Sequence, residues 1–170
     1  MLDEITRLEF ESKRVLDLGT GSGVLGLYCA LRGADVTVAD IDDEAVRYAA
    51  DTGKQLGLEI HGITSDLFSN ILGKFDWILF NPPYLPSEGL NDRTVDGGPK
   101  GRIVINKFLD DLPNHISKDG AALLLVSSLN EPASLILSHQ ELEFTTLATR
   151  RLFFEELQVL RARLRHDLSS

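Results

Sequence analysis

The alternation of short apolar runs with helix-like segments is the feature that most constrains how this chain folds. Runs with the length and composition of buried strands lie at 14–19, 35–40, 59–66, 75–81 and 120–128. Segments with helical periodicity lie at 23–33, 43–57, 101–112 and 130–143. Strands that alternate with helices pair into a mostly parallel sheet with helices on both faces. We therefore expect a doubly wound α/β domain.

Two further runs end the chain, at 144–152 and 157–164, and the short stretch FFEE joins them as a hairpin turn. The run at 59–66 is the weakest and is predicted to be a sheet edge. The fold class predicted is thus α/β: a Rossmann-like, doubly wound, mostly parallel sheet of about seven strands with a C-terminal antiparallel hairpin. The length of 170 residues predicts a single domain over 1–170.

Composition excludes several classes of protein. The chain is 43% hydrophobic and has no apolar run near the roughly 20 residues of a membrane helix. Its first ten residues carry charges where a signal peptide is apolar, so we expect a cytoplasmic protein with no membrane role. Cys29, the only cysteine, is interpreted as a core residue; no disulfide and no metal site is predicted. The net charge of −9 argues against a chain that binds nucleic acid without the help of a basic partner.

A glycine-rich loop, DLGTGSGVLG at 17–26, follows the first strand and opens a helix. Glycines there let a ligand approach the backbone, and Asp40 ends the next strand, where a ribose-binding carboxylate belongs. Residues 21–26 match the dinucleotide pattern G-x-G-x-x-G. Asp17, however, would repel a pyrophosphate and suits a ligand with an ammonium group. The loop therefore favours S-adenosylmethionine over NAD, with a tight turn that binds no ligand as the remaining interpretation.

Polar residues also end the third and fourth strands. Asp66 is followed by Leu67, and Asn81 closes the strand at 75–81. Because ligands bind beyond the carboxyl ends of strands in open α/β sheets, these residues are expected to converge on one crevice. The predicted cofactor-binding residues are Asp17, Gly19, Gly21, Gly23, Asp40, Ile41, Asp66, Leu67 and Asn81.

The cluster Asn81-Pro82-Pro83-Tyr84 suggests the chemistry. The prolines stiffen the backbone and hold the preceding residue extended. The Asn81 side-chain oxygen and the Pro82 carbonyl then form two fixed acceptors, suited to a planar –NH2 group, and Tyr84 offers a ring for stacking. We predict Asn81, Pro82 and Tyr84 as catalytic residues that orient an –NH2 nitrogen toward a methyl donor. A rigid turn is the alternative interpretation.

These motifs resemble a known family. The pattern D-x-G-x-G-x-G resembles the first motif of class I S-adenosylmethionine-dependent methyltransferases. NPPY with GGPKGR at 97–102 resembles the HemK-like release-factor glutamine methyltransferases in their short archaeal and eukaryotic form. The resemblance implies S-adenosylmethionine as cofactor and methylation of the Gln amide in the Gly-Gly-Gln motif of a translation release factor. It also implies a small zinc-binding activator protein as heterodimer partner, contacting the third strand near Ile60 and Ile63.

Three alternatives stay open from the sequence. NPPY serves equally for the exocyclic amine of adenine or guanine in DNA or RNA, and a nucleic-acid patch could form from Arg150, Arg151, Arg161, Arg163 and Arg165. A non-catalytic methyltransferase-like module is the second alternative. A nicotinamide dehydrogenase is the third, although it leaves NPPY unexplained. The segment MLDEITRLEF also lacks the E-P-x-E-D-[ST]-like element of the resembled family. This predicts either a more open cofactor pocket or a cofactor that is weakly held without a partner.

Overall fold

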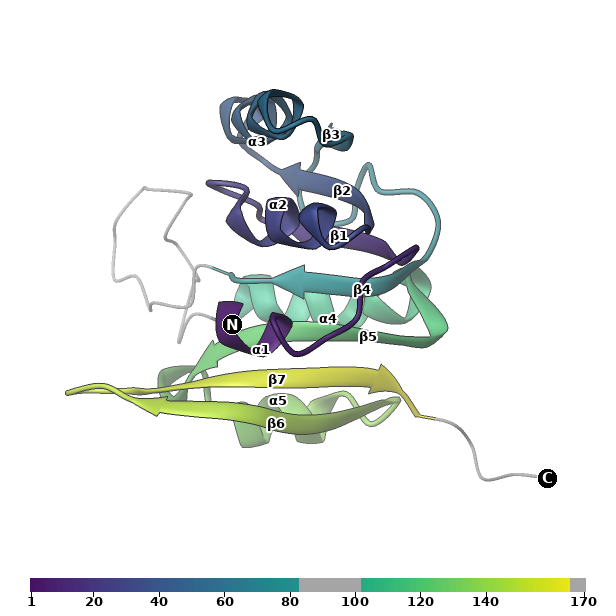
Figure 1. The fold of residues 1–170 in the computed structure, drawn as a ribbon. Helices are drawn as coiled ribbons and strands as arrows, with labels where there is room; N and C mark the ends of the chain where they lie inside the picture. Colours follow the sequence, from purple (N-terminus) through teal and green to yellow (C-terminus); the bar gives the residue numbers. More distant parts are fainter. Residues whose placement is uncertain (83–101, 166–170) are drawn as a thin grey trace.

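A seven-stranded sheet forms the centre of the computed structural model, which describes residues 1–82 and 102–165 (Figure 1). The strand order is β3-β2-β1-β4-β5-β7-β6. Within the described residues, β7 alone runs opposite to the other strands: it is antiparallel to both β5 and β6, and the remaining pairs are parallel. The prediction of a mostly parallel sheet with a C-terminal hairpin is confirmed, and β3 is an edge strand as expected. The strands are β1 Arg14–Leu18, β2 Asp35–Asp40, β3 Ile60–Thr64, β4 Phe75–Phe80, β5 Ile116–Ser127, β6 Leu142–Arg151 and β7 Glu156–Leu164.

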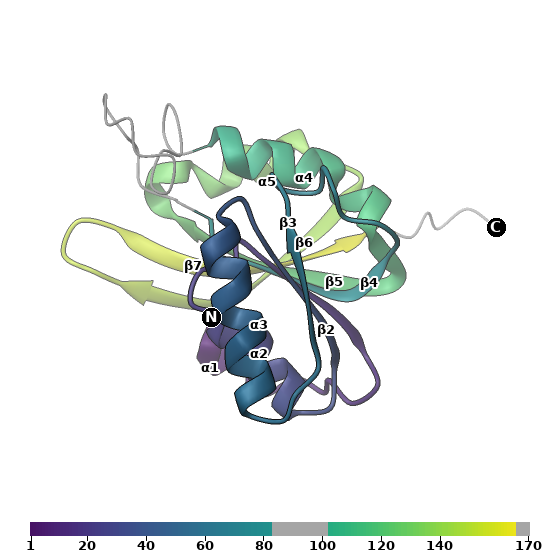
Figure 2. The ribbon, with the colours of Figure 1, turned by 90° about the horizontal axis from the view of Figure 1, so that it is seen from above.

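Helices cover both faces of the sheet (Figure 2). One face carries α1 Leu2–Ile5, α2 Val24–Leu31 and α3 Asp43–Gln55, and the other carries α4 Ile103–His115 and α5 Pro132–Ser138. Successive residues of β1 point to opposite faces: Val15 packs in one core cluster and Leu16 in the other. Burial on both faces explains why the central strands are continuous apolar runs. Cys29 is fully buried in the first cluster, as expected of a core residue.

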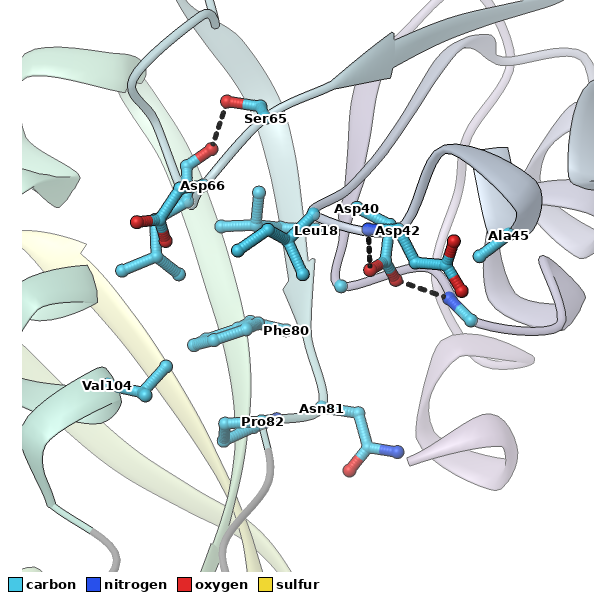
Figure 3. A pocket seen from close by; sticks show the side chains of 14 residues that line it. Leu18, Asp40, Asp42, Ala45, Ser65, Asp66, Phe80, Asn81, Pro82 and Val104 are labelled. Carbon is cyan, nitrogen blue, oxygen red and sulfur yellow. Dashed lines mark hydrogen bonds between the residues drawn. The ribbon is translucent and has the colours of Figure 1, made fainter. Parts of the chain in front are cut away.

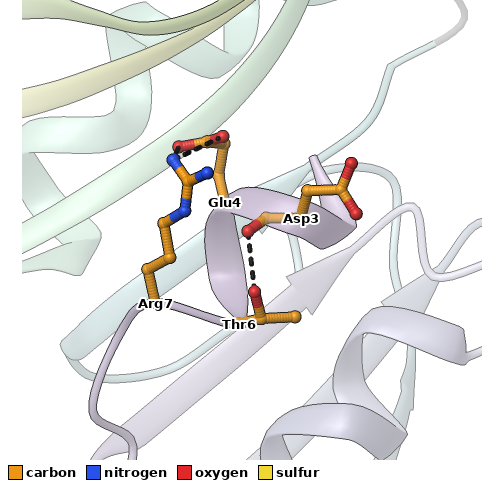
Figure 4. Close-up of polar contacts among 4 residues, drawn as sticks. All are labelled: Asp3, Glu4, Thr6 and Arg7. Carbon is orange, nitrogen blue, oxygen red and sulfur yellow. Dashed lines mark hydrogen bonds and ion pairs between the residues drawn. The ribbon is translucent and has the colours of Figure 1, made fainter.

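The N-terminal residues form an element that the sequence did not predict. In α1 the Thr6 hydroxyl donates to the Asp3 carbonyl at 2.8 Å, and Arg7 pairs with Glu4 at 3.4 Å (Figure 4). Ile5 is fully buried in the α2–α3 side of the core. A helix of four residues has too few positions for a periodic pattern, so its fold depends on this packing. None of the described helices is both long and apolar enough to cross a bilayer.

Three boundaries differ from prediction by three residues or more. The helix predicted to end at 112 continues to His115, with Pro113 inside it. The helix predicted over 130–143 ends at Ser138, because Leu142 is buried in the core and pairs with Leu164 of β7. The strand predicted from 120 begins at Ile116, which pairs with Phe75. The register then shifts, so residues 117–120 form an irregularity in the ladder between β4 and β5.

Candidate cofactor and methyl-transfer site

The carboxyl ends of β1, β2, β3 and β4 surround a cavity of about 390 Å³ (Figure 3). The strand order reverses between β1 and β4, and in open α/β sheets such a switch point is where ligands bind. The volume lies within the range of small-molecule sites. The lining residues are Leu18, Gly19, Gly21, Asp40, Ile41, Asp42, Ala45, Ser65, Asp66, Leu67, Phe80, Asn81, Pro82 and Val104.

The glycine loop is tied to the end of β2. The Thr20 N–H donates to the Ala39 carbonyl at 3.0 Å, and the Gly21 N–H donates to Asp40 Oδ2 at 2.9 Å. Gly21 has φ +50°, a left-handed conformation that disfavours a side chain. Asp40 Oδ1 accepts from the Asp42 N–H at 3.0 Å. Each carboxylate oxygen keeps a further lone pair, so Asp40 can still accept from ligand hydroxyls in the cavity.

Asp17 is buried beneath the loop and does not line the cavity. Its Oδ2 accepts from the Thr20 hydroxyl at 2.7 Å and from the Gly26 N–H at 2.8 Å. Burial raises the pKa of the Asp17 carboxyl from 3.8 to about 7; the two hydrogen bonds oppose this rise and the charge of Asp40 adds to it. Asp17 thus connects β1, the loop and α2.

Gly23 also lies away from the cavity, at the N-terminus of α2. It has φ +78°, and a Cβ there would lie 2.7 Å from the Cβ of Ala49 on α3. A glycine is therefore required for the close approach of α2 to α3. Of the nine predicted cofactor-binding residues, seven line the cavity, and Asp17 and Gly23 support the loop from behind.

The turn after β3 forms one wall of the cavity. The Ser65 N–H donates to the Asp40 carbonyl at 2.8 Å, and the Ser65 hydroxyl donates to the Leu67 carbonyl at 2.8 Å. Leu67 has φ +48°, which costs a non-glycine residue of order 1 kcal/mol. The Asp66 side chain is left exposed beside the half-buried Leu67. In Figure 3, Asp66 and Asp40 lie on opposite sides of Leu18.

Phe80, Asn81 and Pro82 form the opposite wall. Phe80 is 2% exposed and its ring centroid lies 4.6 Å from that of Phe108 on α4. In Figure 3 the Phe80 ring lies between Leu18 and Pro82. Tyr84, Pro83 and the predicted Gly-rich stretch at 97–101 lie outside the described residues.

The sequence analysis did not predict the apolar part of the cavity lining. Leu18, Phe80 and Val104 line the cavity, but in the sequence they are indistinguishable from core residues. Leu18 and Phe80 are each the last residue of a strand, directly before a predicted site residue. That position was the available signal. Val104 had none, because it reaches the cavity through the packing of α4.

The charge of the lining restricts the classes of ligand that the cavity can bind. Three aspartates, at positions 40, 42 and 66, line the cavity, and no lysine or arginine is among the described lining residues. A pyrophosphate would meet like charge there, whereas a nucleoside that carries positive charge would be attracted. Residues 1–82 and 102–165 contain no cluster of His, Cys, Asp and Glu able to hold a metal ion.

Comparison with known proteins shows the family of the chain. The Methyltransferase small domain family matches residues 1–154. A protein of Methanocaldococcus jannaschii, named as a protein N5-glutamine methyltransferase, is 38% identical over 164 residues, which are 91% of this chain and 83% of that protein. The ribosomal RNA small subunit methyltransferase C of Chromohalobacter salexigens is 33% identical over 141 residues, covering 83% of this chain but only 39% of its own length.

A solved structure extends the comparison to the fold. It is the E. cuniculi Mtq2-Trm112 complex, described as responsible for methylation of the eRF1 translation termination factor. The TM-score is 0.77 and the identity 28%, over 96% of this chain and 92% of the other. With a family match over most of its length and the class I methyltransferase fold, this chain belongs to the Methyltransferase small domain family.

Proposed function

We propose that this chain, acting as a single domain, transfers a methyl group from S-adenosylmethionine to the side-chain amide nitrogen of a glutamine in a protein. The substrate proposed is the Gln of the Gly-Gly-Gln motif of a translation release factor. One observation carries the proposal: residues that end four strands, among them Gly19, Asp40, Asp66 and Asn81, converge on one cavity. An acidic and apolar lining suits a cationic nucleoside, and Asn81-Pro82 suits an –NH2 group.

The lining fits S-adenosylmethionine, which when bound supplies an electrophilic methyl group on a sulfonium. Asp40 would accept from the ribose hydroxyls, as the acidic residue at the end of β2. Asp66 would accept from the adenine amino group. Ile41 and Leu67 supply apolar lining against which a base can pack. The loop Gly19–Gly21 leaves backbone accessible to the ligand, and Asp17 and Gly23 hold that loop in place.

Asn81 and Pro82 would orient the accepting nitrogen. The Asn81 side-chain oxygen and the Pro82 carbonyl accept the two N–H groups of a planar amide, and Tyr84 is proposed to stack on it. Fixing the nitrogen in line with the methyl group removes much of the entropic barrier. The two oxygens also stabilise positive charge that develops on the nitrogen. The transfer needs no covalent intermediate on this chain.

A protein substrate is favoured over a nucleic acid by where the arginines lie. Arg163 and Arg165 are exposed at the end of β7. This strand runs antiparallel to β5 and so ends at the end of the sheet away from the carboxyl ends of β1 to β4 (Figure 1). Glu143 lies directly across from Arg163 on β6. Arg161 is half-buried, so the basic strand face of Arg161, Arg163 and Arg165 is small, partly neutralised and at the far end of the sheet from the cavity. Arg150 and Arg151, at the other end of β6, lie on the cavity side, where Arg151 pairs with Glu156 at 3.3 Å. The Methanocaldococcus jannaschii protein, which is similar to 91% of this chain, is also named for glutamine methylation.

We also propose a small activator protein as partner, in line with the Trm112 present in the similar complex. That the proposed activator binds zinc is an expectation that rests on the family resemblance alone. The contact proposed is β3, whose outer edge pairs with no described strand. Ile60 and Ile63 pack partly into the two core clusters, so the open backbone edge of β3, rather than these side chains, is the larger part of that surface.

A labelled-methyl transfer assay tests the proposal. The chain is incubated with labelled S-adenosylmethionine and a class I release factor, its Gln→Glu variant at Gly-Gly-Gln, tRNA, rRNA or DNA, with and without a small activator protein. Transfer to the release factor but not to its Gln→Glu variant supports the proposal. Transfer to nucleic acid alone would replace it with base methylation. Calorimetry with S-adenosylmethionine and NAD checks the cofactor, and binding of NAD alone would refute it.

A further inference from the structure

The turn between β6 and β7 displays the two most exposed large apolar side chains among the described residues. Phe153 and Phe154 are 98% and 96% exposed, and Leu152 beside them is 43% exposed. We call residues 152–154 the hairpin tip. A phenylalanine buries roughly 150–250 Å² when covered, so the tip is an apolar patch of the size that is often functional on a monomer.

The tip is held in place by hydrogen bonds at its base. The Leu152 N–H donates to the Glu155 carbonyl at 2.8 Å and closes the turn. The Ser127 hydroxyl at the end of β5 donates to Glu155 Oε2 at 2.5 Å, and the Glu156 N–H donates to the Ser128 hydroxyl at 3.0 Å. These bonds fasten the turn to β5, so the two rings are presented by an ordered support.

The strand register places the tip at the same end of the sheet as the cavity, beyond the carboxyl ends of the parallel strands. Phe80 is level with Leu124 on β5, which is level with Leu160 on β7 and so with Thr146 on β6. Phe153 follows Thr146 by seven residues, and at about 3.3 Å per residue it projects roughly 20 Å beyond that level. Figures 1 and 2 show the hairpin extending past the other strands in the direction in which β4 points.

Charge and area restrict what can cover the tip. Arg150 and Arg151 flank it on one side and Glu155 and Glu156 on the other, and Arg151 pairs with Glu156 at 3.3 Å. A balanced charge does not favour RNA or an anionic membrane. Two phenylalanines and a leucine supply on the order of 500 Å², below the roughly 800 Å² per partner of a stable dimer. Such a patch suits a partner that is also held elsewhere on this chain.

We propose that the hairpin tip docks the folded body of the protein substrate while its glutamine occupies the cavity. This inference rests on the proposed function and adds a second contact, about 20 Å beyond the strand end that carries Asn81. An extended peptide covers at most about 3.6 Å per residue. A seven-residue peptide centred on the glutamine therefore reaches only about 10 Å to either side and cannot touch the tip.

The test compares two substrates with wild type and the double variant Phe153→Ala/Phe154→Ala. The substrates are a whole class I release factor and the seven-residue peptide around its Gly-Gly-Gln glutamine, with the activator protein added if wild type requires it. For the whole factor, KM and the calorimetric Kd should rise roughly 10- to 100-fold with kcat at saturation unchanged. Rates with the peptide and the affinity for S-adenosylmethionine should not change. Phe153→Leu/Phe154→Leu should retain most of the affinity.

Leu72→Ala is the matched control. Leu72 is 85% exposed, but it precedes β4 and so lies at the opposite end of the sheet, where the parallel strands begin. It should leave both substrates unaffected. Equal losses on factor and peptide, or no loss on either, would overturn the docking site. So would a wild-type dimer that the double variant dissociates, or binding to single-stranded RNA that it abolishes. Failure of the proposed function would give a different result, because wild type itself would then methylate neither substrate. That result would also refute the docking site, which rests on the proposed function.

Discussion

The Asp17 side chain accepts a hydrogen bond from the Gly26 N–H at 2.8 Å, and this contact joins the carboxyl end of β1 to the first turn of α2. The two residues are so close that a Cβ on Gly26 would lie 3.1 Å from Asp17 Oδ2. The same Cβ would lie 2.9 Å from Cγ1 of Val38. The glycine loop between them is therefore fixed at both ends before any ligand binds.

Gly26→Ala should destabilise the protein by about 1–3 kcal/mol, because the added methyl overpacks the junction of α2 with β1 and β2. This loss exceeds the gain of up to about 1 kcal/mol that alanine brings to a helix. Urea unfolding at pH 7 measures it. Leu31→Ala, at a 62% exposed position of the same helix, should change the free energy of unfolding by less than about 0.5 kcal/mol. A neutral or stabilising Gly26→Ala would show that the junction has room.

Asp17→Asn should gain stability relative to wild type as pH rises. The raised pKa of about 7 means that the native state keeps the Asp17 proton up to that pH, while the unfolded chain releases it near 3.8. Wild type therefore loses stability between about pH 4 and pH 7, and asparagine removes this dependence. A shift of about three pKa units corresponds to roughly 4 kcal/mol, so we expect a relative gain of a few kcal/mol that levels off above pH 7.

Denaturant unfolding of both proteins from pH 4 to pH 8 checks this dependence. Asp51→Asn, an exposed position on α3, is the control. A difference between wild type and Asp17→Asn that does not vary with pH would mean that the Asp17 carboxyl is ionised throughout.

Asn81→Ala should separate binding from transfer. Removing one of the two acceptors that orient the –NH2 group should lower kcat roughly 100- to 1000-fold, while the affinity for S-adenosylmethionine stays within about threefold. Single-turnover transfer and calorimetry measure the two quantities. Asn114→Ala, an exposed asparagine near the end of α4, is the control. Loss of both activities together would indicate a structural role for Asn81.

Asp40→Asn should weaken cofactor binding by roughly 10- to 100-fold, because the amide has only one acceptor oxygen where the carboxylate has two. The Gly21 N–H and the Asp42 N–H both donate to this carboxylate, so the loop also loses one bond. Calorimetry with S-adenosylmethionine measures the affinity, with Asp51→Asn again as control. Unchanged affinity would assign Asp40 to the loop alone.

Local patterns were sufficient for the order of elements. Strands buried on both faces appear in the sequence as apolar runs such as 77–80. Asp42 precedes α3 and accepts from the Glu44 N–H at 2.9 Å, as expected of an aspartate before a helix. The polar residue at each strand end followed from the same pattern. The end of α5 at Ser138 and the start of β5 at Ile116 were predicted wrongly. Pairing of β6 with β7 and of β5 with β4 decides these boundaries, and such pairing has no local signal.

The sequence by itself determined the α/β class, the edge position of β3, and eight residues of the cavity wall, because hydrophobic period and strand-end position are local properties. Tertiary structure alone decided that Asp17 and Gly23 lie behind the loop, that Val104 reaches the cavity, and that Phe153 and Phe154 stay in water on the cavity side. These facts depend on which elements pack together and on strand register, which join residues far apart in the chain.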